Sequence, residues 1–507
     1  MIDPVLLLTI AATAIALYQI LPETKQVRIS YAIGKNYLLC IFLIVVGVVA
    51  LSIVSATSFL NISDNLIWFW DFALNASFIF ELIQLMALFG ILAIIFVIFF
   101  KTTIPIANKN NFIEILENFW LENKYIAFFS LIEENYASLF IPETEMNLLE
   151  RDPFLDYFNA KLSDDAFIAK LVLFKPYLGL KICLDQQLES DFKELFIDQY
   201  FKELIRNEKS ILYHEIKCSQ NTVLGTCRRF LIEEQNKILY SLFSDLHVAH
   251  NIGYRFGIWR PIGEAVMKVL DTKYSQRFDD YNEYRANLGL TLRSNLKDPV
   301  FCGITFFDIM ITEAIYQRFQ SHFFLYYYEY FIDKICRNFQ INDAADPAAE
   351  FPNYYAVLLK SIIYNMRDWV QLIESDTQNV SQPVTNLTPH GDNQNIIKHA
   401  IICFAHCLGT ILRCRNLSQR LKFDFFEEYM DLYFDLAKST DDLVRKYAEV
   451  MKNCLLDNLQ SNKQNGDYRN EIIQAWEFFD KIPMRLDTIG HPILDEFERQ
   501  FHEALRV

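Results

Sequence analysis

The chain has 507 residues, of which 52% are hydrophobic and 15% aromatic, and its formal net charge is −16. This length predicts two or three folding units. A sequence pI near 5.1 excludes broad, non-specific nucleic-acid binding, which needs a basic surface, although a small basic pocket in an acidic domain stays open. The 10 cysteines form no CxxC pair, a pattern typical of free thiols in a reducing compartment.

Three apolar stretches near the N-terminus are long enough to cross a membrane. They run over residues 5–21, 37–60 and 78–100. A hydrocarbon core about 30 Å thick needs roughly 20 helical residues, so each stretch can span it, the first only just. The sequence therefore predicts a transmembrane domain over residues 1–105 that contacts membrane lipid. In an alternative arrangement the first stretch lies along the membrane and only the other two cross.

The loops between these stretches differ in charge, and this difference predicts the orientation. The first loop holds Lys25, Arg28 and Lys35, whereas the second holds Asp64 and Asp71 without a base. Basic loops stay in the cytoplasm. We therefore expect a periplasmic N-terminus, a bacterial inner-membrane location and a cytoplasmic domain beyond residue 100.

The third stretch contains two polar residues, Glu81 and Gln84, three positions apart. Spaced in this way they share one face of a helix, and an ionisable group within a span normally faces protein or water. We take them as pore candidates; in the alternative, Glu81 lies at the outer headgroup boundary. Three helices cannot enclose a pore, so a pore requires a homo-oligomer, with a tetramer as the first expectation.

The rest of the chain has few helix breakers, with only 14 Gly and 14 Pro in the whole protein. Apolar residues at helical spacing recur along it, for example Phe192, Leu195, Phe196, Tyr200 and Leu204. The fold class predicted is all-α, with helical subdomains over 111–341 and 354–507. A segment over residues 170–184 is the exception, and we expect a short extended stretch there.

The sequence contains two groups of metal-ligating residue types. His247 and His250 have metal-ligand spacing but no Glu between them and no third ligand. A second group lies between residues 398 and 414 and comprises His399, Cys403, His406, Cys407 and Cys414. The apolar residues among them favour a buried helix with thiols as small fillers over a zinc site. Nucleotide-binding, hydrolase and kinase motifs are absent, so we predict no enzyme activity, cofactor or metal.

Two segments reverse the acidic character of the chain. Residues 254–297 carry eight bases against five acids, together with aromatic residues. Residues 393–422 carry five bases and no acid. Arginine with aromatic side chains suits phosphate and base recognition. The first set of ligand-binding candidates is Arg255, Trp259, Arg260, Lys268, Lys273 and Arg277; the second is Arg413, Arg415, Arg420 and Lys422. In the alternative, these bases pair with acids on neighbouring helices or subunits.

A membrane anchor followed by a large helical domain resembles the layout of Hailong-type membrane effectors of bacterial anti-phage defence. The resemblance is one of architecture and carries over no functional residue. It implies an oligomeric ion channel that depolarises the membrane and responds to a nucleotide or oligonucleotide made by a partner nucleotidyltransferase. The rival hypotheses are a non-conducting, membrane-tethered scaffold for protein partners and, third, an enzyme on lipid-linked substrates that uses one of the histidine groups.

Overall fold

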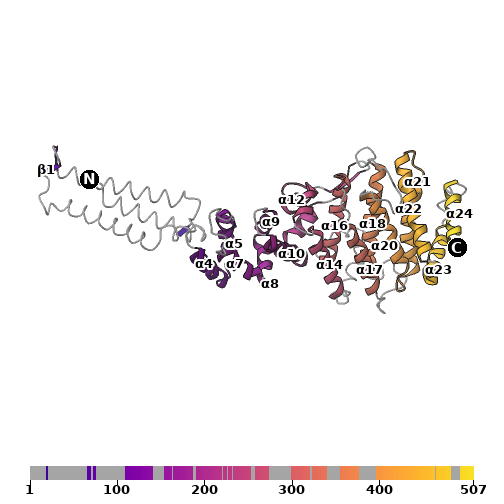
Figure 1. Cartoon of the computed structure of the whole chain (residues 1–507), viewed down its shortest axis with the longest axis horizontal. Coiled ribbons are helices and arrows are strands. Elements are labelled where there is room, and N and C mark those ends of the chain that lie inside the picture. The colour runs from indigo at the N-terminus through magenta and orange to yellow at the C-terminus, as the bar shows by residue number, and fades with distance from the viewer. Residues whose placement is uncertain are drawn as a thin grey trace. The chain divides into compact units, whose positions relative to one another are not determined.

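The computed structural model describes residues 19–20, 66–69, 72–75, 109–140, 153–162, 164–185, 190–219, 221–224, 227–230, 232–252, 257–272, 298–319, 323–339, 354–375, 396–462, 464–480 and 492–506 (Figure 1). Packing divides the chain into two compact units, one ending at Ser163 and one beginning at Asp164. Helices form nearly all of the described structure, which confirms the all-α class. The three predicted membrane stretches lie outside the described residues except for Gln19 and Ile20.

The described part of the first unit contains a β-hairpin and four helices. The elements are β1 (Leu66–Phe69), β2 (Phe72–Asn75), α4 (Lys109–Leu121), α5 (Tyr125–Glu134), α6 (Tyr136–Phe140) and α7 (Pro153–Leu162). The strands pair antiparallel, with Leu66 opposite Asn75. Phe154 and Phe158 of α7 pack around Phe140, with ring centroids 5.3 and 5.4 Å from it. Aromatic side chains at helical spacing therefore build the core of these helices.

The second unit contains a further hairpin and a long series of helices. These are α8 (Asp165–Phe174), α9 (Pro176–Leu184), α10 (Ser190–Arg206), α11 (Ile211–Cys218), β3 (Asn221–Leu224), β4 (Cys227–Phe230), α12 (Lys237–Phe243), α13 (Leu246–Asn251), α14 (Trp259–Thr272), α16 (Pro299–Tyr316), η3 (Phe323–Leu325), α17 (Tyr326–Asn338), α18 (Tyr354–Ser375), α20 (Ile396–Leu412), α21 (Gln419–Ala437), α22 (Asp442–Ser461), α23 (Gly466–Asp480) and α24 (Pro492–Arg506). The α10 helix contacts α14, and α14 contacts α16 and α17. Further along, α18 contacts α16, α20 and α21, so helices on both sides of residue 345 are in contact.

The prediction of an extended stretch over residues 170–184 is wrong, because the segment forms the end of α8 and all of α9. Lys175 alone separates the two helices. Pro176 occupies the first position of α9, where its missing N–H leaves no helical hydrogen bond unmade. Leu171 and Val172 in α8 and Ile182 in α9 are buried. Because both helices are largely buried, the segment is apolar almost throughout, and its sequence therefore resembles that of a buried strand.

The α16 helix of the second unit has an almost entirely apolar sequence. Asp298 caps its start, with Oδ1 accepting the N–H of Val300 at 3.1 Å. Among the described residues it is the one helix long and apolar enough to cross a membrane, and most of it is buried within the protein. Its buried Asp308 accepts a hydrogen bond from Trp369 Nε1 of α18 at 2.8 Å. These features are those of a core helix.

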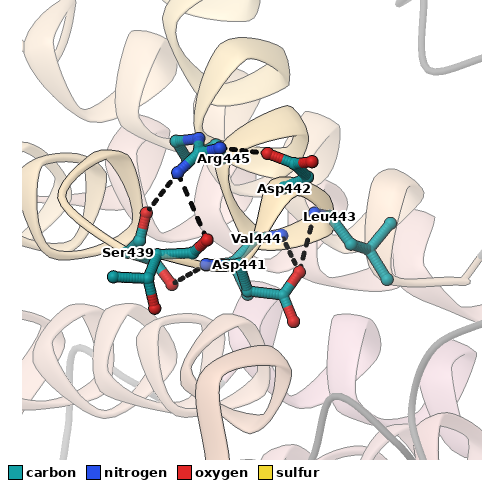
Figure 2. A network of polar contacts seen from close by, with 7 residues as sticks. Ser439, Asp441, Asp442, Leu443, Val444 and Arg445 are labelled. Atoms are coloured by element: carbon teal, nitrogen blue, oxygen red, sulfur yellow. Dashed lines mark hydrogen bonds and ion pairs between the residues drawn. The ribbon is translucent and has the colours of Figure 1, made fainter.

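A polar network around Asp441 starts α22 (Figure 2). Asp441 Oδ1 accepts the N–H groups of Leu443 at 2.8 Å and of Val444 at 3.4 Å, which satisfies donors that have no partner within the helix. Arg445 Nη1 donates to the carbonyl oxygen of Ser439 at 3.0 Å, and its other terminal nitrogen pairs with Asp442. The turn between α21 and α22 is fixed in this way, and the network is a helix cap.

Candidate functional site

The structure places some of the predicted site residues. Glu81 and Gln84, the pore candidates, lie outside the described residues, as do Arg255, Lys273 and Arg277 of the first ligand-binding set. The described members of that set lie on α14. All members of the second set lie at or just after the turn between α20 and α21, residues 413–418. Two surfaces can therefore be compared.

Trp259, the first residue of α14, packs inside the protein. Its side chain is 9% exposed. The ring of His250 is stacked on it, with centroids 5.4 Å apart and planes inclined by 25°, and the ring of Phe324 lies 5.7 Å away. Because these two rings cover the indole, Trp259 has little surface left on which a base could stack.

The His247 and His250 pair contributes to the same packing. Both rings contact Phe319, at 5.1 and 5.5 Å between centroids. Burial lowers the pKa of His250, and the neighbouring His247 lowers it further. Both effects favour the neutral imidazole, as expected for a histidine within an aromatic cluster.

Arg260 pairs with one acid on its own helix, Glu264, and belongs to a charge network that reaches α10. Its Nε donates to Glu264 Oε1 at 2.8 Å, and Lys202 Nζ of α10 lies 2.8 Å from Glu264 Oε2. The same Nζ lies 2.8 Å from Asp198 Oδ1. Although burial raises it, hydrogen bonds from Lys202 and Arg260 hold the pKa of Glu264 below its usual value. Arg260 and Lys202 are thus neutralised by Glu264 and Asp198. This is the arrangement expected if the bases pair with acids on neighbouring helices.

Three exposed aromatic side chains lie on η3 and α17, and they are not among the residues predicted from the sequence. Phe323, Tyr326 and Tyr330 are 62%, 40% and 54% exposed. Tyr327 between them turns inward, and its ring lies where a side chain on Gly263 of α14 would be. Residues 323, 326 and 330 are three and four positions apart, which places them on one face of a helix. This spacing is the feature of the sequence from which the group could have been predicted. We call these three residues the aromatic surface.

The turn between α20 and α21 presents a different surface. Arg413, Arg415 and Arg420 are all exposed. The α21 helix begins directly after the turn, at Gln419, with Ser418 as its N-cap. The positive end of the α21 dipole and three exposed arginines therefore occupy one short stretch. We call these three residues the arginine surface.

Arg413 makes polar contacts with neutral groups. Nη1 donates to Asn462 Oδ1 at 2.8 Å, and Nη2 donates to Thr410 Oγ1 at 3.3 Å. The guanidinium carbon lies 5.6 Å from the centroid of the Tyr468 ring. These contacts orient the guanidinium without neutralising its charge. Arg413 thus differs from Arg260, whose partner is a carboxylate.

Lys422, the fourth member of the second set, is a buried structural residue. Its side chain is 2% exposed, and Nζ lies 2.9 Å from Glu471 Oε1 of α23. Such a pair fixes α21 against α23, because breaking it would leave a charge in the interior. Lys422 therefore supports the turn from within and does not present its ammonium group to a ligand outside.

The α20 helix is largely buried, and its cysteines lie inside the protein, whereas the side chain of His406 is 50% exposed, with Nδ1 3.4 Å from Glu329 Oε1. Cys403 and Cys407 are buried, with their Sγ atoms 3.9 Å apart, and Cys403 Sγ lies 3.5 Å from the carbonyl oxygen of Leu325. Burial raises the pKa of Cys407 well above its usual value. Within the part of the chain that the structure describes, no three His, Cys, Asp or Glu side chains are grouped so as to hold a metal ion.

Comparison with known proteins gives no relative: no protein-family model, no curated protein and no solved structure matches the chain.

Proposed function

We propose that the chain is an oligomeric membrane effector of anti-phage defence. In this proposal it is an ion channel, or another membrane-depolarising protein, controlled by a nucleotide or oligonucleotide bound to its cytoplasmic helices. Three apolar stretches in the first hundred residues support the membrane part, and the charge of the connecting loops supports the inner membrane with a cytoplasmic second unit. Three spans are too few to enclose a pore, which supports oligomerisation.

The arginine surface is the observation that carries the ligand part of the proposal. The chain has a net charge of −16, yet Arg413, Arg415 and Arg420 are exposed together beside the start of a helix. Exposed charge of the opposite sign is not needed for solubility in an acidic protein. Guanidinium groups form paired, charge-assisted hydrogen bonds with phosphate oxygens. Because Arg413 is held by neutral partners, its charge remains available for a phosphate.

Calorimetry on the full chain in detergent tests this assignment with di- and trinucleotides as probes. The double substitution of Arg413→Glu and Arg420→Glu should weaken binding at least about tenfold, because it replaces two attractions to phosphate by repulsions. The matched control is Lys446→Glu with Arg499→Glu, two exposed bases on α22 and α24, of which Arg499 already pairs with Glu503 at 3.4 Å. Equal losses in both proteins would show a general charge effect.

The first predicted set provides a second arm for the same experiment. The double substitution of Lys273→Glu and Arg277→Glu alters the segment after α14. On α14 itself, Arg260 is already neutralised by Glu264. Unchanged binding in this variant, with lost binding in the Arg413 and Arg420 variant, supports the arginine surface. The reverse result would transfer the site to the segment after α14.

The aromatic surface favours the alternative, a non-conducting scaffold. Phe323, Tyr326 and Tyr330 present large apolar area to solvent, and aromatic residues are enriched where proteins bind proteins. In that function the membrane stretches serve only as an anchor. Conductance distinguishes the two functions, because a scaffold carries no current whether or not a nucleotide is present.

A further inference from the structure

Cys414, in the turn between α20 and α21, lies against Cys336 near the end of α17. Its Sγ is 3.5 Å from the carbonyl oxygen of Cys336, and the two thiols share a hydrogen bond. A second contact joins the same segments, since Asn416 Nδ2 donates to the carbonyl oxygen of Phe339 at 2.9 Å. Two thiols from segments distant in the sequence are thus held together by the fold.

The two thiols differ in acidity. The hydrogen bond from Cys336 opposes the effect of burial and, together with smaller contributions from the N–H groups of Asn416 and Leu417 and from the Lys422 ammonium, lowers the pKa of Cys414 to about 7. The same hydrogen bond, together with burial, raises the pKa of Cys336 well above its usual value. A thiolate is the reactive form of cysteine. Cys414 is therefore suited to attack an oxidant, and Cys336 to react in a second step.

Other described cysteines lack this combination. Cys403 and Cys407 lie on one helix and are both fully buried. Cys218 is exposed, and its recorded side-chain contact is with His214 Nε2 at 3.6 Å. Cys414 is buried, at 6% exposed, whereas Cys336 is half-buried, so a small oxidant reaches the pair from the side of Cys336.

We propose that Cys336 and Cys414 are a redox modification site, at which a peroxide converts the two thiols into a reversible disulfide. The Cys414 thiolate attacks one peroxide oxygen, the O–O bond breaks, and the departing hydroxide takes up a proton to give water. The resulting sulfenic acid is attacked by the Cys336 sulfur, which forms the S–S bond and releases a second water. The two sulfurs together lose two electrons, and hydrogen peroxide gains them.

The disulfide fixes the turn between α20 and α21 to the end of α17 by a covalent bond. In the reduced protein non-covalent contacts join these segments, among them the hydrogen bond between the two thiols and that from Asn416 to the carbonyl oxygen of Phe339. Arg413 and Arg415 lie on either side of Cys414, so oxidation restricts the arginine surface. That consequence rests on the proposed function, whereas disulfide formation itself does not.

Peptide mapping tests the site without any nucleotide. The reduced full chain in detergent is treated with hydrogen peroxide, alkylated, digested and analysed by mass spectrometry. We expect a peptide pair linked through Cys336 and Cys414 that disappears after treatment with dithiothreitol. Cys403 and Cys407 should remain reduced. If a peroxide dose that oxidises Cys218 leaves Cys336 and Cys414 as free thiols, or links either to another cysteine, the proposal is wrong.

Two variants separate the roles within the pair. Cys336→Ser should leave Cys414 as a sulfenic acid that dimedone traps, whereas Cys414→Ser should abolish trapping at Cys336. Trapping at Cys336 in the second variant would overturn the assignment of Cys414 as the attacking thiol. Because the wild-type map requires no substitution, a variant that fails to fold leaves the test of the disulfide intact.

Discussion

Replacement of Gly263 by alanine should destabilise the second unit, because Tyr327 occupies the space that a methyl group would need. An added Cβ would lie 2.2 Å from Cδ1 and Cε1 of that ring, whereas ordinary contacts begin at 3.4 Å. The ring or the helix must then move by more than 1 Å. Overpacking of this kind costs about 1–3 kcal/mol, against a gain of about 1 kcal/mol from the helix propensity of alanine. We expect a net loss of about 1 kcal/mol.

Gly466 provides the matched control, since nothing lies within 4 Å of a Cβ added there. Gly466→Ala should be neutral or stabilising by up to about 1 kcal/mol, from helix propensity alone. Thermal unfolding of both full-length variants in detergent, followed by far-UV circular dichroism, gives the comparison. A Gly263→Ala protein that melts at or above the wild-type temperature would refute the packing of Tyr327 on α14, and with it the placement of the aromatic surface.

Three further predictions concern charge and orientation. Burial raises the pKa of Glu215, outweighing the hydrogen bonds from the N–H groups of Leu239 and Ile238. A carboxyl group whose pKa is raised in the folded state contributes stability that is present below the unfolded value of 4.5 and lost as the pH rises. The melting temperature of wild type, relative to that of Glu215→Gln, should therefore fall between about pH 4 and pH 7. An increase over this range would contradict the prediction. Lys422→Met should cost about 3 kcal/mol, and adding Glu471→Met should restore most of it in thermal melts; no recovery would argue against a direct pair. A reporter fused after Val507 should be active only in its cytoplasmic form, and periplasmic activity would reverse the predicted orientation.

Helical class and core positions could be predicted from residue spacing. In α10, the spacing identified Phe192, Phe196, Tyr200 and Leu204, and all four are buried. It also included Leu195, which is 45% exposed. At 3.6 residues per turn Leu195 lies beyond the edge of the stripe formed by the other four, so the position of the neighbouring helices decides its exposure.

The candidate sites were predicted less completely, because burial and pairing depend on helices distant in the sequence. The sequence shows that Trp259 and Arg260 are neighbours on α14. It does not show that Lys202 of α10 completes the charge network around Arg260, or that His250 and Phe324 cover the indole of Trp259. The Cys336 and Cys414 pair could not be found by spacing, since packing alone brings α17 to the turn. By contrast, the absence of acids from residues 393–422 pointed to the bases around the turn between α20 and α21; three of them, Arg413, Arg415 and Arg420, are exposed, whereas Lys422 is buried.

Electrical recording from the purified full chain in a planar lipid bilayer tests the central claim most directly. The proposed function predicts discrete current steps whose open probability changes when di- or trinucleotides are added to the side that faces the second unit. The Arg413→Glu and Arg420→Glu protein should conduct but ignore the nucleotide. Absence of current from correctly oriented wild-type oligomers, with and without nucleotide, would contradict the channel and favour the scaffold.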